Sequence, residues 1–427
     1  MKKLLIWLIT AGLLIAAVAV AVVWLNLRDE VDVRVPVATI TPSDTRLARG
    51  AYLARAGNCM GCHTARGGPT YAGGRGIATP FGTVFSSNLT PDEKTGIGSW
   101  SPAHFWRAMH NGRSKDGRLL YPAFPYPNYT QVTREDSDAL LAYLHSLPAV
   151  EQARPPHALR FPYDSQAALA VWRALYFKPG VYEADTQRSA EWNRGAYLVR
   201  GLGHCAACHT ARNALGASSG ALDLAGGLIP MQNWYAPSLS SPHEAGVGDW
   251  DRQHIVDLLK TGVSPRASAT GPMADVVLRS TQYLSDADLG AVAQFLKELA
   301  PPATLAPQAA PAAPASVLAR GTKLYEQHCT QCHGEQGRGV PQAYPALAGN
   351  RAVTMPQTAN LVQIILNGGY APATAGNPRP FGMPPFVLVL SDSEVAAVLT
   401  YIRQSWGNRA GVVTPLEVNR MRRNGGR

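Results

Sequence analysis

Three five-residue segments decide how this sequence folds, and all six of its cysteines lie in them. The segments are Cys59-Met60-Gly61-Cys62-His63, Cys205-Ala206-Ala207-Cys208-His209 and Cys329-Thr330-Gln331-Cys332-His333. Each has the pattern Cys-x-x-Cys-His, and successive segments are separated by roughly the length of one small domain. The chain of 427 residues is too long for one ordinary core, so the repeated pattern predicts tandem domains.

The spacing within each segment fits covalent attachment of haem. Two thiols separated by two residues can add to the two vinyl groups of one haem, and the adjacent histidine can ligate its iron. Structural zinc usually takes four ligands from two such elements, and a redox pair does not need the histidine. We therefore predict three covalently attached haem c groups, bound by Cys59, Cys62 and His63, by Cys205, Cys208 and His209, and by Cys329, Cys332 and His333, with the histidines on iron.

The residues around each segment repeat as well. A helix-like stretch with an Arg-Gly pair precedes each segment, at residues 49–53, 194–198 and 320–325. A helix with an apolar stripe follows each segment and starts with an N-cap signal, at Thr133 with Asp136, Ser285 with Asp288, and Ser391 with Glu394. Glycine in the first helix lets the last helix approach closely, which is how a small c-type domain closes over its haem.

These repeats predict a mainly α protein of three tandem class I cytochrome c domains and an N-terminal transmembrane helix. The boundaries that we expect are 1–30 for the membrane anchor, 44–150 for domain 1, 151–188 for a connector, 189–300 for domain 2, 301–316 for a Pro/Ala-rich linker, 317–406 for domain 3 and 407–427 for a basic tail. The aromatic-rich part of the connector fits a strut between domains or a helix that docks a partner.

The N-terminal segment predicts a membrane anchor. The run from Leu4 to Leu25 carries no charge and is long enough, as a helix, to cross a bilayer. A cleaved signal peptide is the alternative, but its apolar core is usually shorter, about 7–15 residues. Lys2 and Lys3 before the run place the N-terminus in the cytoplasm. We expect the haem domains in the periplasm, held on the inner membrane.

The net charge of +10 does not indicate binding to nucleic acid, because the basic residues are scattered along the chain. The clearest basic cluster lies in the C-terminal stretch from Arg420 to Arg427. We expect this stretch to be a solvated tail, with docking on lipid or on a protein partner as the alternative.

Methionine opposite histidine raises the potential of a haem, and the chain offers candidates for such a sixth iron ligand. Met383 and Met273 both follow a glycine that ends a helix, Gly368 and Gly262 respectively. This shared position makes them the expected iron ligands of domains 3 and 2. The competing candidates are Met355 and Met231, which both precede that helix.

Domain 1 departs from this pattern. Phe124 occupies the place of the expected methionine in the loop Leu120–Tyr126. Met109 lies on the helix that ends at Gly112, where alignment with domain 2 makes its position an inward one. Met109 either ligates the iron or packs against the haem without ligating it, and His110 is a further candidate. The sixth ligand of this haem stays open.

With these motifs, the chain resembles the triheme cytochrome c subunits of bacterial membrane-bound dehydrogenases. The resemblance extends from about Arg49 to Trp406 and includes two further stretches, Leu119–Ala123 and Trp234–Leu239. Closely similar cytochromes accompany molybdenum hydroxylases. In the alcohol dehydrogenase members the loop around Phe124 carries methionine, so the ligation of the first haem is not carried over.

The resemblance implies electron transfer rather than catalysis by this chain alone. A separate catalytic subunit of the flavin, quinone-cofactor or molybdenum type oxidises the substrate, and the cytochrome passes electrons to ubiquinone or a terminal oxidase. Two other functions stay open: a free-standing membrane-anchored carrier, and a haem enzyme that uses an open first haem.

Overall fold

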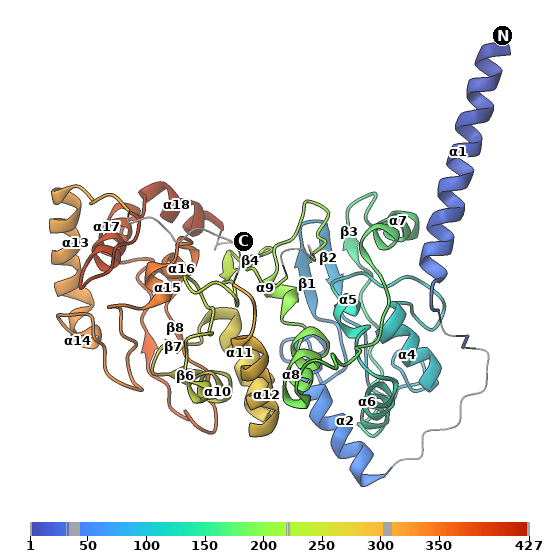
Figure 1. Cartoon of the computed structure of the whole chain (residues 1–427), viewed down its shortest axis with the longest axis horizontal. Helices are drawn as coiled ribbons and strands as arrows, with labels where there is room; N and C mark the ends of the chain where they lie inside the picture. The colour runs from blue at the N-terminus through green and yellow to red at the C-terminus, as the bar shows by residue number, and fades with distance from the viewer. Residues whose placement is uncertain are drawn as a thin grey trace. The chain divides into compact units, whose positions relative to one another are not determined.

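The structure is a computed structural model that describes residues 2–30, 32–33, 43–218, 220, 223–301 and 310–424. It is mainly helical, as predicted, and separates into two compact units (Figure 1). Unit 1 comprises Met1–Ala184 and Arg200–His204, and unit 2 comprises Asp185–Val199 and Cys205–Arg427.

Unit 1 contains the first Cys-x-x-Cys-His segment and the N-terminal apolar helix. Its helices are α1 (Lys2–Leu27), α2 (Asp44–Ala56), α3 (Cys59–His63), α4 (Pro102–Asn111), α5 (Tyr126–Tyr129), α6 (Arg134–His145) and α7 (Gln166–Tyr176). A small antiparallel sheet joins β1 (Gly76–Thr79), β2 (Gly82–Phe85) and β3 (Ala158–Leu159) in that order. Helix α1 is long and apolar enough to cross a membrane.

Unit 2 contains the other two segments. Its helices are α8 (Ala190–Arg200), α9 (Ala206–His209), α10 (Arg252–Thr261), α11 (Gly271–Arg279), the 3-10 helix η2 (Thr281–Tyr283), α12 (Asp286–Lys297), α13 (Ala315–His328), α14 (Thr330–His333), α15 (Arg351–Thr354), α16 (Ala359–Asn367), α17 (Asp392–Gln404) and α18 (Pro415–Asn424). Its hairpins pair β4 (Gly227–Ile229) with β5 (Trp234–Ala236), β6 (Val263–Ser264) with β7 (Ala267–Ser268), and β8 (Gly369–Tyr370) with β9 (Gly382–Met383).

The two halves of unit 2 are joined by polar contacts. The Asn360 side chain on α16 exchanges two hydrogen bonds with the backbone of Tyr235 on β5, at 2.8 and 2.7 Å. The guanidinium of Arg351 donates to Asp249 at 2.7 Å and to the Gly246 carbonyl at 2.6 Å. These contacts explain why two haem-motif regions cluster as one unit.

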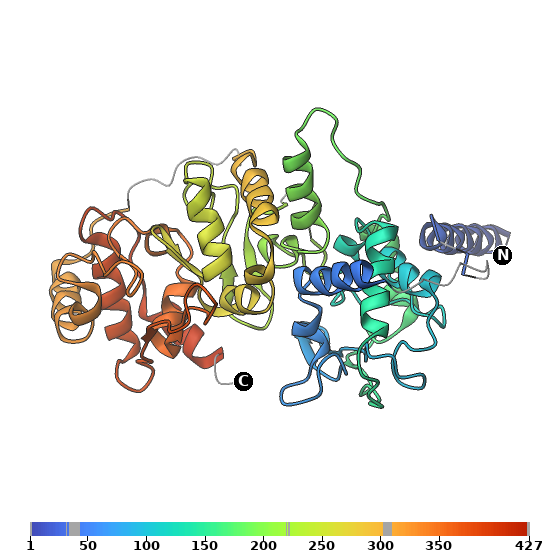
Figure 2. The ribbon, with the colours of Figure 1, turned by 90° about the horizontal axis from the view of Figure 1, so that it is seen from below.

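The expected crossing of first and last helices is present three times. Glycine lies where α2 meets α6, where α8 meets α12 and where α13 meets α17, and Figure 2 shows the first crossing from below. A Cβ atom on Gly50, Gly195 or Gly321 would collide with a backbone carbonyl of the last helix. The predicted role of these glycines is confirmed.

The predicted N-caps of the last helices are confirmed too. The side chains of Thr133, Ser285 and Ser391 each accept a hydrogen bond from the backbone three residues on. The carboxylate of the acidic residue at that third position also accepts a hydrogen bond from the arginine that precedes the crossing glycine. The pairs are Arg49–Asp136 at 2.7 Å, Arg194–Asp288 at 2.7 Å and Arg320–Glu394 at 3.1 Å. Each Arg-Gly pair therefore joins the first helix to the last helix in two ways. The glycine allows the close contact, and the arginine forms the ion pair.

Changing Gly50 to alanine is expected to destabilise unit 1 by about 1–3 kcal/mol, because the new Cβ meets the Ala139 carbonyl and the Cβ of Tyr143. Gly180 is the matched control in the same unit, since an added Cβ there has no neighbour within 4 Å. Denaturation of the haem-loaded protein, followed by far-UV circular dichroism, measures both. Equal midpoints for the two variants would contradict the close-packing role of Gly50.

The C-terminal stretch differs from the expectation of a solvated basic tail. Within the expected tail, residues Pro415–Asn424 form α18, which buries Val418 and pairs Arg422 with Asp392 at 2.7 Å. The helix packs on α16 and α17, while Arg420 and Arg423 beside Val418 stay exposed, as expected for a solvated basic stretch. The centre of the expected Pro/Ala-rich linker, residues 302–309, lies outside the described residues.

Candidate functional site

Each Cys-x-x-Cys-His segment forms one short helical turn, at α3, α9 and α14. In the first two segments the first cysteine is half-buried and the second is exposed, whereas in the third both are half-buried. All six cysteines lie in the described part of the chain, and none forms a disulfide. The two sulfur atoms of each segment thus remain available for addition to one haem.

The histidine of each segment is oriented in the same way by a backbone carbonyl. The Nδ1 atom of His63 lies 2.7 Å from the Ser87 carbonyl oxygen, and that of His209 lies 2.7 Å from the Pro237 oxygen. The corresponding distance from His333 to the Pro345 oxygen is 3.0 Å. A carbonyl can only accept, so Nδ1 donates and carries the ring proton. Nε2 is therefore left as the unprotonated nitrogen that an iron ligand needs.

The surroundings favour the neutral form of these rings. Burial lowers the pKa of His63, His209 and His333, and the carbonyl hydrogen bonds oppose this shift only in part. Neutral imidazole is the form that ligates iron.

The thiols do not resemble those of a redox-active pair. Burial raises the pKa of Cys59 and of Cys205 to about 12 and that of Cys329 to about 11, so these groups stay protonated near neutrality. Catalytic thiol pairs instead have a lowered pKa. Among the described residues, no group of three or more His, Cys, Asp or Glu side chains converges as in a zinc site.

The carbonyl groups of Ser87, Pro237 and Pro345 were not predicted from the sequence. The sequence does contain a pattern that could have indicated them. A leucine follows each of these residues by two positions, at Leu89, Leu239 and Leu347. The backbone N–H of each leucine donates to a carbonyl of the loop that follows the haem motif. The same local fold thus presents an acceptor to each histidine.

Apolar clusters surround two of the segments closely. Cys59 and Met60 pack against a buried cluster that contains Leu53, Tyr71 and Met109. Cys329 packs against a second cluster, which contains Tyr325 and Leu399 and is also contacted by Met383. Half-buried cysteines beside an apolar core suit a large apolar ring bound through sulfur. The residues present therefore fit covalently attached haem.

The two methionines expected as sixth ligands occupy different local structures. Met383 lies in β9, which pairs with β8. Strand β8 begins directly after Gly368, the residue that caps α16. Met273 lies in the first turn of α11 rather than in a loop, after Gly262 has capped α10. Both capping glycines have positive φ, as the helix-ending positions predict. The ligation of iron by Met273 and Met383 stays a prediction.

The competing methionines have other surroundings. Met231 is 63% exposed in the turn between β4 and β5. Met355 is buried and follows α15, and its carbonyl oxygen accepts a hydrogen bond from Arg403 at 2.9 Å.

In unit 1, the expected inward position of Met109 is confirmed. Its side chain is 5% exposed in the cluster against which Cys59 packs. Phe124 contacts the same cluster, and its ring lies 5.3 Å from that of Tyr129. His110 points elsewhere: its ring stacks on Trp106 at 4.7 Å and its Nδ1 lies 2.8 Å from the Thr130 carbonyl oxygen. Aromatic and thioether groups thus converge on the first haem segment.

The haem at Cys59–His63 is expected to bind carbon monoxide when reduced, because the loop residue Phe124 cannot ligate iron. Met109→Leu preserves most of the side-chain volume, so it should leave this binding unchanged if Met109 only packs. Difference spectra of the reduced full-length protein, with and without carbon monoxide, measure it. Binding that appears only in Met109→Leu would instead identify Met109 as the sixth ligand.

Comparison with known proteins agrees with this geometry. The cytochrome c family model matches residues 47–148 and 318–406. The chain is 39% identical over 394 residues to the cytochrome c subunit of alcohol dehydrogenase (quinone) from Gluconacetobacter polyoxogenes, covering 88% of this chain and 84% of that protein. It is 38% identical over 400 residues to the gluconate 2-dehydrogenase cytochrome c subunit of Pantoea cypripedii, covering 89% and 90%.

A third relative is the cytochrome subunit of fructose dehydrogenase from Gluconobacter japonicus. The chain is 34% identical to it over 428 residues, covering 94% of this chain and 87% of that protein. The family expected from the sequence is confirmed by these relatives. A chain this similar, over most of its length, to the cytochrome c subunits of alcohol, gluconate and fructose dehydrogenases belongs to that family and binds haem c covalently.

Proposed function

We propose that this chain is a triheme electron-transfer subunit of a dehydrogenase complex. It consists of three tandem cytochrome c domains with the boundaries expected from the sequence, and each holds one haem c. The observation that carries the proposal is the histidine geometry, in which Nδ1 of His63, His209 and His333 meets a backbone carbonyl in the same way. Three equivalent sites in one chain suit a relay rather than a single reaction centre.

The chain's residues have separate tasks in this relay. The cysteines fix each haem, and the carbonyl acceptors keep each histidine ring turned with Nε2 free for iron. Bound haem supplies one-electron oxidation and reduction at its iron. The apolar clusters around Cys59 and Cys329 keep water away from the haem sites, which favours electron transfer with little rearrangement of the surroundings.

The proposed partners are a catalytic subunit that donates electrons and a membrane acceptor that receives them. A separate catalytic subunit, with flavin, a quinone cofactor or molybdenum, oxidises its substrate and reduces this chain. The chain then passes the electrons to ubiquinone or to a terminal oxidase. Relatives serve alcohol, gluconate and fructose dehydrogenases.

Helix α1 is the proposed uncleaved anchor, with the haem domains in the periplasm. Lys2 and Lys3 at its start favour a cytoplasmic N-terminus. Its last turn and the residues after it are bound to the folded unit: Asn26 donates to the Ala170 carbonyl at 2.9 Å, and Arg113 pairs with Glu30 at 3.1 Å. A segment that is removed after export has no need for such contacts.

Purification of the full-length, haem-loaded chain from native membranes tests the proposal. We expect a dehydrogenase subunit to co-purify in a fixed ratio, identified by mass spectrometry, and its substrate to reduce the haems. An unrelated membrane protein with the same affinity tag is the control. A chain that purifies alone, and whose haems no dehydrogenase substrate reduces, would favour the free-standing carrier instead.

A further inference from the structure

Helix α7 has an apolar face that the described part of its unit leaves exposed. Its sequence, from Gln166 to Tyr176, contains one charged residue, Arg173. Leu169 and Arg173 form the buried face, with Arg173 only 3% exposed. Val171 and Leu175 lie about 200° around the helix from these residues and are 48% and 65% exposed. With exposed Ala167, they form a stripe of residues spaced by four, which we call the α7 stripe.

Helix α7 is attached to the end of the apolar helix α1, beside which it lies in Figure 1. The Asn26 side chain, in the last turn of α1, donates to the Ala170 carbonyl and accepts from Arg173 Nε, both at 2.9 Å. Arg28 donates to the Phe177 carbonyl at 3.3 Å. The α7 stripe therefore lies close to the level at which α1 ends.

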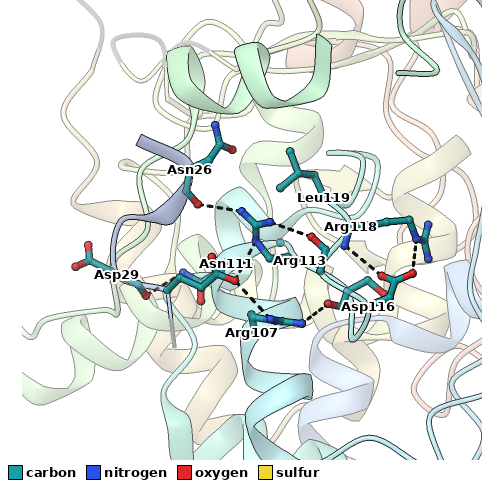
Figure 3. Close-up of polar contacts among 12 residues, drawn as sticks. Asn26, Asp29, Arg107, Asn111, Arg113, Asp116, Arg118 and Leu119 are labelled. Carbon is teal, nitrogen blue, oxygen red and sulfur yellow. Dashed lines mark hydrogen bonds and ion pairs between the residues drawn. The ribbon is translucent and has the colours of Figure 1, made fainter. Parts of the chain in front are cut away.

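The orientation of α7 relative to α1 is fixed by the folded unit. Arg173 donates to the Asn111 carbonyl at 2.7 Å, at the carboxyl end of α4. Arg113 follows α4 and donates to the Asn26 carbonyl at 3.3 Å, and the Asn111 side chain donates to the Asp29 carbonyl at 3.1 Å (Figure 3). Cations at a helix carboxyl terminus interact favourably with its dipole. One cluster thus ties α1, α4 and α7 together.

We propose that α7 lies in the interfacial layer of the bilayer at the carboxyl-terminal end of α1, with the α7 stripe against the acyl chains. The inference rests on the proposed anchor. An apolar helix face beside a membrane span, whose charged residue turns inward, gains free energy by leaving water for lipid. Trp172 and Tyr176 form a ring pair at 5.6 Å on this helix, and such rings favour the headgroup layer. Exposed Lys178 follows the helix and suits lipid phosphates.

This contact would hold unit 1 against the membrane at two places, along α1 and along α7. A single span leaves a domain free to rotate and tilt about one helix, whereas a second contact restricts both motions. The connector between the expected domains 1 and 2 would then serve as a membrane-binding element rather than only as a strut.

Photocrosslinking from lipid tests the inference. The full-length, haem-loaded protein is placed in nanodiscs whose phospholipids carry a diazirine in the acyl chain, and the lipid adducts are mapped by peptide mass spectrometry. We expect adducts on the peptides of α1 and α7 and none on α2 or α6. Val171→Asp with Leu175→Asp should remove most α7 adducts and leave those on α1 unchanged. Thr45→Asp with Ala48→Asp, at exposed positions of α2, is the matched control and should change neither.

The outcomes separate this inference from the proposed anchor. Adducts on α1 without any on α7 would overturn the α7 inference and leave the anchor supported. An absent or unlabelled α1 peptide would overturn the anchor itself. Lipid adducts on α7 that persist unchanged in Val171→Asp with Leu175→Asp would show that the α7 stripe is not the part of the helix in contact with lipid, and would overturn its assigned role.

Discussion

Replacing Met383 with alanine is expected to lower the midpoint potential of the haem at Cys329–His333 by at least about 0.1 V. Axial ligands set haem potentials over a range of about 0.8 V, and methionine opposite histidine raises them. Met383 is well placed for this role, because β8 and β9 hold it beside Gly368 and it packs against the same buried cluster as Cys329. Redox titration, with the near-infrared band of methionine-ligated iron, measures the change.

Met355→Ala is the control for this experiment. Met355 is buried in the same unit, so its loss creates a cavity without removing an expected ligand. It should lower stability while leaving the near-infrared band intact. If Met355→Ala weakens the band and Met383→Ala does not, the two assignments are reversed. Met273→Ala is likewise expected to lower the midpoint potential of the haem at Cys205–His209.

The covalent haem count is expected to fall from three to two when one motif loses both cysteines. Cys329→Ala with Cys332→Ala removes both thioether bonds of one haem, whereas the other two motifs keep theirs. The pyridine haemochrome assay on denatured protein gives the number of haems per polypeptide. The variant should also accumulate poorly, because haem completes the core of a small domain.

Gln331→Ala is the control inside the same motif. It lies between the cysteines and should keep all three haems, since the attachment chemistry uses only the cysteines and the histidine. Two haems in the fully matured wild-type protein would contradict the assignment of three sites. Stain that persists on the denatured chain distinguishes covalent from loosely bound haem.

The sequence by itself determined the local features of this protein. The attachment segments, the Arg-Gly pairs of the first helices and the caps of the last helices recur within short stretches, such as Ser391 with Glu394. Their chemistry restricts the choice of residue: thioether bonds need cysteine, a close helix crossing needs glycine at Gly195, and an N-cap needs a short polar side chain. Such requirements can be recognised without knowing the remainder of the fold.

The tertiary structure decided what depends on groups distant in the chain. The acceptors for the histidines are backbone carbonyls, such as that of Pro237, and any residue can provide a carbonyl. The burial of Val418 in α18 depends on α16 and α17, and the docking of α7 on α1 depends on Asn26 reaching Arg173, far along the chain. Composition near these residues indicates a basic tail and an aromatic connector. Only the folded chain supplies the partners that order the tail and the connector, because burial and hydrogen bonding depend on residues from several parts of the chain.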